Sequence, residues 1–139
     1  MPVEDDIRKF LALGSVAVVG ASRDRTKYGN IVYRELRGRG LRVFAVNPNA
    51  ESIEGDPCYA SLGALPAKVE GAVIVVAPAE TERAVRDAAA AGIGSVWMQP
   101  GAESREAVRF CEERGLCAVH NACILVALRR APSSGGLDS

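Results

Sequence analysis

A short run of β-branched and small residues that stops at a glycine constrains the fold of this chain more than any other feature. The run extends from Val16 to Ser22 with its glycine at Gly20, and a helical pattern follows from about Tyr28 to Arg37. These patterns predict a buried strand, a tight turn and a helix. Backbone N–H groups at the start of a helix have no partner within it, and the helix dipole favours an anion there. The segment therefore predicts a phosphate-binding site.

Positive charge is concentrated directly after this turn. Between Arg23 and Arg42 lie seven Arg or Lys residues and two acidic ones, which gives seven minus two, or +5. The whole chain has 17 basic and 17 acidic residues, so the remainder carries −5. A local basic segment beside such a turn indicates a ligand rich in phosphate. The neutral overall balance argues against non-specific binding of nucleic acid, which requires a broad positive field.

Several other classes of protein fit the sequence poorly. No apolar run approaches the roughly 20 residues that cross a bilayer, and the acidic start at residues 1–6 lacks the positive charge of a signal peptide. The chain has one histidine and no C-x-x-C pair, so the spacing predicts no metal site. We expect a cytoplasmic protein with reduced thiols and no membrane partner. The four cysteines are Cys58, Cys111, Cys117 and Cys123.

Strand and helix patterns alternate along the chain. Helices are predicted at about 3–13, 28–38, 81–91, 103–114 and 123–129, with Thr81 as the cap of the third. Strands are predicted at 15–20, 42–46, 71–77, 95–99 and 116–120, with a short edge strand at 56–59 and a turn or short helix at 61–66. This alternation indicates an α/β fold with a Rossmann-like, doubly wound, mainly parallel sheet and helices on both faces. One domain is expected over residues 1–130, followed by a disordered tail at 131–139.

The carboxyl ends of the strands predict where a ligand binds. In a doubly wound sheet, ligands bind at these ends, near the point where the strand order reverses. The ends carry small residues, polar residues and proline. They fall at Gly20-Ala21-Ser22, Asn47-Pro48-Asn49, Ala77-Pro78, Gln99-Pro100-Gly101 and His120-Asn121. We therefore expect a site along this edge of the sheet.

The turn departs from the dinucleotide fingerprint G-x-G-x-x-G in two ways. After Gly20-Ala21-Ser22, the next glycine is Gly29, and the second strand ends at Asn47-Pro48 instead of an acid. Without a carboxylate for the ribose hydroxyls, NAD is disfavoured. NADP or another phosphorylated adenosine stays open, so an NADP-binding oxidoreductase is one alternative.

Taken together, five motifs resemble those of the small CoA-binding proteins, which are similar to the N-terminal CoA-binding domain of the succinyl-CoA synthetase α subunit. The resemblance covers residues 13–128. The matching motifs are Gly20-Ala21-Ser22, Lys27, Asn47-Pro48, Trp97-Met98-Gln99-Pro100-Gly101 and Asn121-Ala122-Cys123. The family often has a proline in the loop before its lysine, where this chain has residues 23–26.

The resemblance implies a Rossmann-like fold that holds coenzyme A, or an acyl-CoA, in its cleft. Backbone N–H groups of the turn would hold the pyrophosphate, and the basic residues after it would contact the phosphates. The implied binding residues are Gly20, Ala21, Ser22, Arg25 and Lys27 for the phosphates, Asn47 and Pro48 for the adenosine, Ala77 and Pro78 for the adenine or the pantetheine arm, and Gln99, Gly101 and Asn121 on the same edge.

Three side chains on this edge could take part in chemistry, but simpler roles are favoured. Ser22 lacks the G-x-S-x-G surroundings of a nucleophile. His120 is interpreted as structural or rim-exposed, because no partner is visible. Cys123 could face the thiol of the ligand, but a buried thiol is the simpler reading. We predict no catalytic residue.

The biological role is left with two hypotheses beside the oxidoreductase. The first is a non-catalytic CoA-binding protein that acts as a carrier, a sensor or a regulatory module. The second is a subunit of a split acyl-CoA synthetase with a separate catalytic chain. In the synthetases the phosphorylated histidine lies in a second domain, and neither that domain nor an ATP-grasp module corresponds to any part of this sequence. Catalysis by this chain alone is therefore not expected, and a homodimer stays open.

Overall fold

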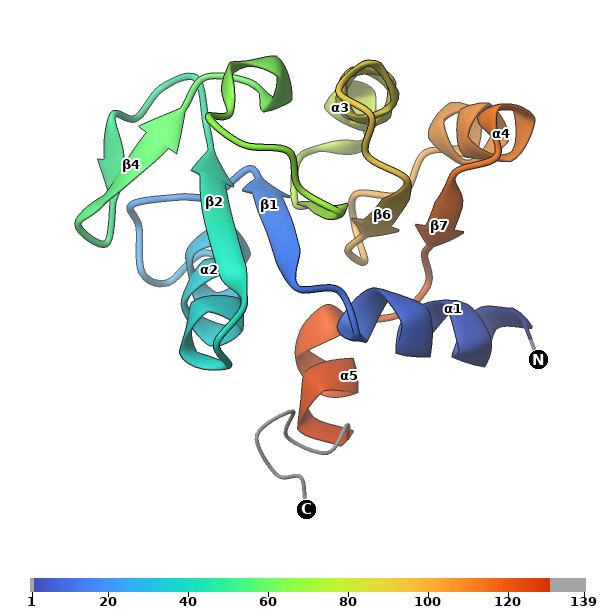
Figure 1. The fold of residues 1–139 in the computed structure, drawn as a ribbon, viewed down its shortest axis with the longest axis horizontal. Helices are drawn as coiled ribbons and strands as arrows, with labels where there is room; N and C mark the ends of the chain where they lie inside the picture. Colours follow the sequence, from blue (N-terminus) through green and yellow to red (C-terminus); the bar gives the residue numbers. More distant parts are fainter. Residues whose placement is uncertain (1, 131–139) are drawn as a thin grey trace.

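The computed structural model describes residues 2–130, so the tail predicted to be disordered lies outside the described residues. Its strands are β1 (Ser15–Val19), β2 (Arg42–Val46), β3 (Ser52–Ile53), β4 (Asp56–Tyr59), β5 (Gly71–Ile74), β6 (Ser95–Met98) and β7 (Cys117–Val119). Its helices are α1 (Pro2–Leu11), α2 (Tyr28–Gly38), the 3₁₀ turn η1 (Leu62–Ala64), α3 (Pro78–Ala90), α4 (Arg105–Arg114) and α5 (Ile124–Arg130). The strands form one sheet between two layers of helices (Figure 1). This arrangement confirms the predicted α/β, Rossmann-like fold class.

The strand order of the sheet is β3-β4-β2-β1-β5-β6-β7. Neighbouring strands are parallel except for the antiparallel pair of β3 and β4. The chain moves outward from β1 through β2 to β4, and then returns to the other side of β1 to form β5. The strand order therefore reverses between β1 and β5, which is the place where open α/β sheets bind ligands.

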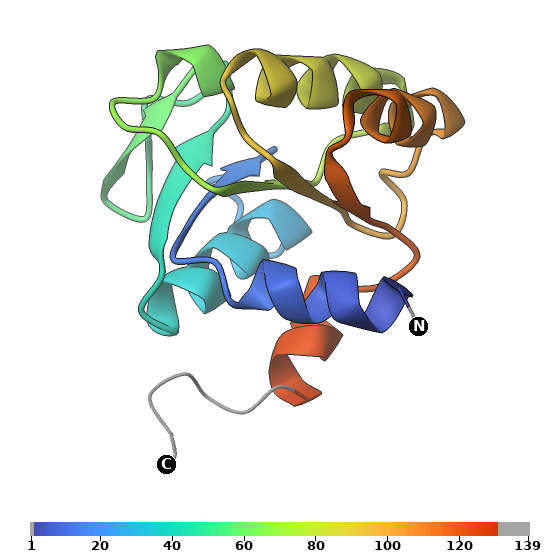
Figure 2. The same ribbon diagram turned by 45° about the vertical axis from the view of Figure 1, so that its right-hand side comes forward.

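Each face of the sheet has its own apolar core. Helices α1, α2 and α5 cover one face, whereas α3, α4 and η1 cover the other (Figures 1 and 2). Within β1, Val16 and Val18 belong to the first core and Ala17 belongs to the second. This explains the continuous apolar run in the sequence, because a strand covered on both faces needs apolar side chains on both.

Trp97 contributes an aromatic contact and a hydrogen bond to the first core, in addition to its buried apolar surface. Its side chain is fully buried, and its ring meets Phe10 edge to face with the centroids 5.4 Å apart. The indole N–H donates to the carbonyl of Ala122 at 2.9 Å. The tryptophan therefore packs in the core, and it also anchors the segment that leads into α5.

The start of α3 corrects the sequence prediction. The helix begins at Pro78, with Ala77 as its N-cap, and not at Thr81. Proline fits the first helical position, since the N–H it lacks would have had no partner there. Thr81 lies inside the helix, fully buried, and its hydroxyl donates to the carbonyl of Ala102 at 2.6 Å. The side chain thus ties α3 to the loop after β6 and does not cap a helix.

The hairpin of β3 and β4 was only half predicted, because β3 was missed. Its turn has Glu54 at φ 53° and Gly55 at φ 81°. Two-residue hairpin turns use this left-handed region, and Asn-Gly or Asp-Gly are their usual sequences. A Glu-Gly pair gives a weaker signal, because glutamate rarely adopts a positive φ. The hairpin lies against the basic segment, where Glu54 and Asp56 meet Arg25 and Arg37.

Candidate ligand-binding site

Gly20 forms the turn at the end of β1. Its φ is +96°, and a Cβ at this position would lie 2.3 Å from the carbonyl oxygen of Val75, which follows β5. A side chain here would be strained by the backbone conformation and blocked by the neighbouring strand. The turn therefore passes directly against the segment after β5, at the reversal of the strand order.

Gly29 brings the first turn of α2 against the same place. A Cβ on Gly29 would lie 2.0 Å from the carbonyl oxygen of Gly20 and 3.2 Å from the Cα of Ala21. Close packing of helix on strand is the role of the third glycine in the dinucleotide fingerprint. Gly20 and Gly29 produce the same contact with a longer loop between them.

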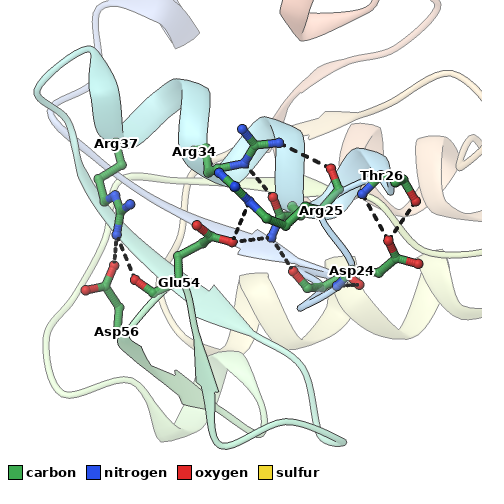
Figure 3. Close-up of polar contacts among 9 residues, drawn as sticks. Asp24, Arg25, Thr26, Arg34, Arg37, Glu54 and Asp56 are labelled. Carbon is green, nitrogen blue, oxygen red and sulfur yellow. Dashed lines mark hydrogen bonds and ion pairs between the residues drawn. The ribbon is translucent and has the colours of Figure 1, made fainter.

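The loop between the two glycines is held by its own polar groups (Figure 3). The hydroxyl of Ser22 accepts the N–H of Asp24 at 3.0 Å, and Asp24 accepts both the N–H of Thr26 at 3.0 Å and its hydroxyl at 2.6 Å. The hydrogen bond from the Thr26 hydroxyl, followed by that from its N–H, lowers the pKa of Asp24. These hydrogen bonds define the conformation of the loop, although it contains no proline.

Two helix N-termini meet this edge of the sheet without a side-chain cap. Lys27 is the N-cap of α2 and Ala77 is the N-cap of α3, and neither side chain makes a capping hydrogen bond within the described residues. Helix α4 follows β6, one strand farther from the reversal, and its N-cap Ser104 accepts the N–H of Ala107 at 3.2 Å. The uncapped ends leave backbone N–H groups available to an anion.

A crevice of about 550 Å³ lies at this edge. Val19, Val46 and Val76 give it apolar walls, and one face of α3 forms another side. Of the predicted binding residues, three line this crevice: Gly20, Asn47 and Pro48. A volume of this size falls within the ~300–1,000 Å³ that is usual for small-molecule sites.

Asn47 uses its side chain to join two parts of the edge. Its Nδ2 donates to the carbonyl of Ala21 at 2.7 Å, and its Oδ1 accepts the N–H of Asn49 at 2.8 Å. The amide therefore connects the tip of β2 to the Gly20 turn. The residue borders the crevice while its polar atoms are engaged within the protein.

Gln99 has a similar internal role farther along the edge. The side chain is buried, its Oε1 accepts the N–H of Ile124 at 2.6 Å, and its Nε2 donates to the Sγ of Cys123 at 3.5 Å. Gln99 thereby holds the start of α5. These contacts give Gln99 and Cys123, which belong to the sequence motifs, a structural role that needs no ligand.

The remaining predicted residues spread along the rim. Ala77 and Pro78 are exposed at the start of α3. Gly101 has φ +94°, and its N–H donates to Glu103 at 2.9 Å. Asn121, at φ 64°, lines a separate hollow beside His120 and α4, of about 640 Å³. The structure therefore brings the turn and the β2 tip together in one crevice and places Asn121 outside it.

Carboxylates of the β3–β4 hairpin neutralise part of the basic segment. Arg25 Nε lies 3.3 Å from Glu54 Oε2, and Arg37 forms an ion pair with Asp56 (Figure 3). The charge of +5 counted along the chain is therefore partly neutralised in the fold, because these arginines pair with a hairpin whose first strand was not predicted. Within residues 2–130, Lys27 and Arg23 form no ion pair, so both loop cations remain available to a ligand.

Asn30 connects this hairpin to the loop between Gly20 and Gly29, and sequence reasoning missed it. The residue is fully buried, and its Nδ2 donates to the carbonyl of Ser22 at 2.8 Å and to Glu54 Oε2 at 3.0 Å. The Asn30 hydrogen bond is the main influence that lowers the pKa of Glu54, and the charge of Arg25 adds to it. Arg34 completes the set by donating from Nε to Asn30 Oδ1 at 2.6 Å.

Comparison with known proteins identifies the family to which this chain belongs. A family model described as "CoA binding domain" matches residues 14–129. The chain belongs to this CoA-binding family. The motif resemblance stated from the sequence is thereby confirmed.

The relatives of this CoA-binding domain include much longer proteins. It is 33% identical over 119 residues to acetate–CoA ligase (ADP-forming) I of Archaeoglobus fulgidus, a match that covers 78% of this chain and 17% of that protein. It is 27% identical over 120 residues to the alpha subunit of acetate–CoA ligase (ADP-forming) II of Pyrococcus furiosus, covering 78% and 26%. The chain thus spans about a quarter or less of the length of these curated relatives.

A solved structure matches the CoA-binding domain over nearly its full length. A hypothetical protein from Pyrococcus horikoshii OT3 is 35% identical, with a TM-score of 0.87, and the match covers 91% of this chain and 90% of that one.

Among the helices within residues 2–130, none has the length and apolar character to cross a membrane. The same residues contain no cluster of three His, Cys, Asp or Glu side chains suited to a metal ion.

Proposed function

We propose that this protein binds coenzyme A, or an acyl-CoA, in the crevice between the Gly20 turn and α3, and that it does so as a carrier, sensor or regulatory module without transforming the ligand. The observation that carries the proposal is the contact between Gly20 and Gly29, which sets the uncapped N-terminus of α2 against the turn. Backbone N–H groups at such an end bind phosphate without a dedicated side chain.

The two ends of the ligand would meet different chemistry. The pyrophosphate would lie against residues 20–22 and the start of α2, where Lys27 supplies a cation. The adenosine would extend toward Asn47 and Pro48, which border the apolar part of the crevice. Arg25 already pairs its Nε with Glu54, so it would contact a phosphate through its Nη groups or after leaving that carboxylate. The distribution of apolar wall and polar edge suits a nucleotide with an attached chain.

A binding role is favoured over catalysis because, within the described residues, neither Ser61, which lines the crevice, nor Ser22, at the turn, donates a hydrogen bond to a base. Ser22 already accepts a hydrogen bond from Asp24, and the single histidine of the chain, His120, lines the separate hollow. Nucleophilic catalysis needs a hydroxyl or thiol within hydrogen-bond reach of a base. A cytoplasmic location forms part of the proposal, since it would keep the four thiols reduced.

A second function is favoured by one specific comparison. The Pyrococcus furiosus relative is named as the alpha subunit of an acetate–CoA ligase, and this chain matches about a quarter of it. We therefore also propose, as the alternative, that the protein is the CoA-binding subunit of a split acyl-CoA synthetase. In that case the domains that form the acyl–CoA bond would reside on a separate chain.

The deciding experiment starts with the purified protein. Small molecules released by denaturation are identified by mass spectrometry, and the protein is then titrated with CoA, acetyl-CoA, NADP and NAD by calorimetry. Saturable binding of CoA or acetyl-CoA with no NADP response supports the proposal. Binding of NADP without CoA would refute it in favour of an oxidoreductase.

The same preparation separates the two proposed roles. Acetyl-CoA, ADP and phosphate are added, and ATP formation is measured with and without proteins that co-purify with the chain. Activity that requires a co-purifying ATP-binding partner supports the subunit. A chain that binds CoA, purifies alone and forms no ATP supports the carrier or sensor.

A further inference from the structure

Three charged residues line the crevice, and a single one of them is a cation. Glu80, Arg83 and Asp87 all come from α3, three and four residues apart, so they share one face of the helix. Of the seven basic residues between Arg23 and Arg42, none is among the described residues that line the crevice. Among the described residues that line the crevice, Arg83 on α3 is therefore the one cation.

Arg83 differs from its neighbour Arg86 in what it contacts. Arg86 Nη2 lies 2.8 Å from Glu82 Oε2, and the guanidinium lies 4.5 Å from the centre of the Phe110 ring. Arg83 is exposed and forms no ion pair with a carboxylate of residues 2–130. A guanidinium offers five N–H donors in a planar fork that fits phosphate. Arg86 donates from Nε and Nη2 to Glu82, whereas no hydrogen bond from Arg83 is found within the described residues.

The tip of β2 lines the same crevice as Arg83. In Rossmann-like folds, this tip lies beside the ribose of the adenosine, where an acid binds free hydroxyls and an arginine accommodates a ribose phosphate. Here the tip has Asn47 and Pro48 in place of an acid. Coenzyme A differs from dephospho-CoA only in the phosphate on that ribose, so a nearby guanidinium would distinguish the two.

We propose that Arg83 recognises the ribose phosphate and makes the site selective for coenzyme A over dephospho-CoA. This inference rests on the proposed binding of CoA in the crevice. Glu80 and Asp87 flank Arg83, and their negative charges repel a phosphate. A ribose phosphate therefore gains affinity in this place only through direct contact with the guanidinium. Selectivity depends on that single side chain, and its removal leaves a wall with two carboxylates.

The test compares the affinities for coenzyme A and dephospho-CoA in three proteins by calorimetry. These are the wild type, Arg83→Gln and the control Arg86→Gln, which removes the same charge from the same helix. We expect the wild type to prefer coenzyme A by about tenfold or more, as for one charge-assisted contact. Arg83→Gln should lose or reverse that preference while its affinity for dephospho-CoA stays unchanged. Arg86→Gln should keep the preference.

Each other outcome has a distinct meaning. A wild type that binds both nucleotides equally, or an Arg83→Gln variant that keeps the wild-type ratio, would overturn the role of Arg83 and leave the proposed function standing. A wild type that binds neither nucleotide would overturn the proposed function itself. The ratio of two affinities within one variant is insensitive to partial unfolding, because loss of folded protein lowers both equally.

Discussion

The carbonyl oxygen of Gly20 lies where a side chain on Gly29 would begin, 2.0 Å from the position of a Cβ. The end of β1 and the first turn of α2 therefore touch backbone to backbone. This contact determines how far the uncapped N–H groups of α2 lie from the Gly20 turn. The stability of the fold and the shape of the proposed phosphate site thus depend on the same pair of glycines.

Gly29→Ala should weaken both folding and ligand binding. The added methyl has backbone atoms in its way, so α2 must shift, and overpacking of this kind costs about 1–3 kcal/mol. Urea unfolding measures the first effect, and calorimetry with CoA measures the second. Gly38→Ala is the matched control in the same helix, because a Cβ there meets nothing within 4 Å. That control should be neutral or stabilising by about 0.5–1 kcal/mol.

The outcome that contradicts this reasoning is a Gly29→Ala protein with wild-type stability. It would mean that α2 can move away from β1 without cost. Unchanged CoA affinity in a destabilised variant would be a different result, since it would separate the packing role of Gly29 from the phosphate site.

Local patterns predicted the sheet well because local physics decides those segments. The apolar runs at residues 16–19 and 71–74 had to be strands covered on both faces, and Gly20 had to be a turn. Their order along the chain then predicted the parallel sheet and the edge that carries the crevice. What sequence could not supply were the pairings between distant residues. Glu54 meets Arg25 and Asn30 only because the sheet brings the hairpin beside α2.

The same limit applies to the predicted site. Gln99 and Asn47 were chosen for their place at strand ends, and that placement is correct. Their polar atoms bind neighbouring backbone, which no pattern along the chain reveals. Arg83 was not predicted as a site residue. An arginine on a helix is normally a solvated side chain, and no pattern along the sequence indicates that it lines a crevice.

Lys27→Ala should lower the affinity for CoA by about 1–2 kcal/mol, the contribution of one charge-assisted contact. Lys27 is exposed at the N-terminus of α2 and forms no ion pair within the described residues, so its removal should leave the stability nearly unchanged. Lys68→Ala is the control, because Lys68 lies before β5, at the opposite edge of the sheet. If both variants bind CoA with equal affinity, Lys27 does not contact a phosphate of the ligand.

The ion pair of Arg37 and Asp56 should make the free energy of unfolding depend on pH. A hydrogen bond from the Tyr33 hydroxyl at 2.6 Å, opposed by partial burial and aided by Arg37, lowers the pKa of Asp56 below its ordinary 3.8. A depressed carboxyl pKa adds stability above the unfolded-state value, and this is lost as the pH falls through the folded-state value. Asp56→Asn should therefore destabilise the protein by a constant amount between pH 7 and 5.

Below about pH 4, the difference between Asp56→Asn and the wild type should shrink, because the wild-type carboxyl becomes protonated as well. Urea unfolding of both proteins at four values between pH 7 and 3 measures this difference directly. A gap that stays constant down to pH 3 would show that Asp56 stabilises the fold without its charge.

The thiols should differ in reactivity in a fixed order. Burial, with a smaller effect of Glu112, raises the pKa of Cys111 to about 11, so roughly one thousandth of it is thiolate at pH 8. Burial also acts to raise the pKa of Cys123, but hydrogen bonds from Gln99 and from the N–H groups of Val126 and Leu125 lower it overall. Iodoacetamide at pH 8, followed by peptide mapping, should modify Cys123 first and Cys111 last.

Gln99→Leu tests the cause of this order, since it replaces the amide that donates to the Cys123 sulfur by an apolar side chain of similar size. We expect alkylation of Cys123 to slow, while Cys58, whose pKa is raised mainly by burial, keeps its rate. Gln99 also accepts the N–H of Ile124, so circular dichroism must show that α5 remains folded. An unchanged rate at Cys123 in a folded variant would assign its thiolate to the backbone N–H groups of α5 alone.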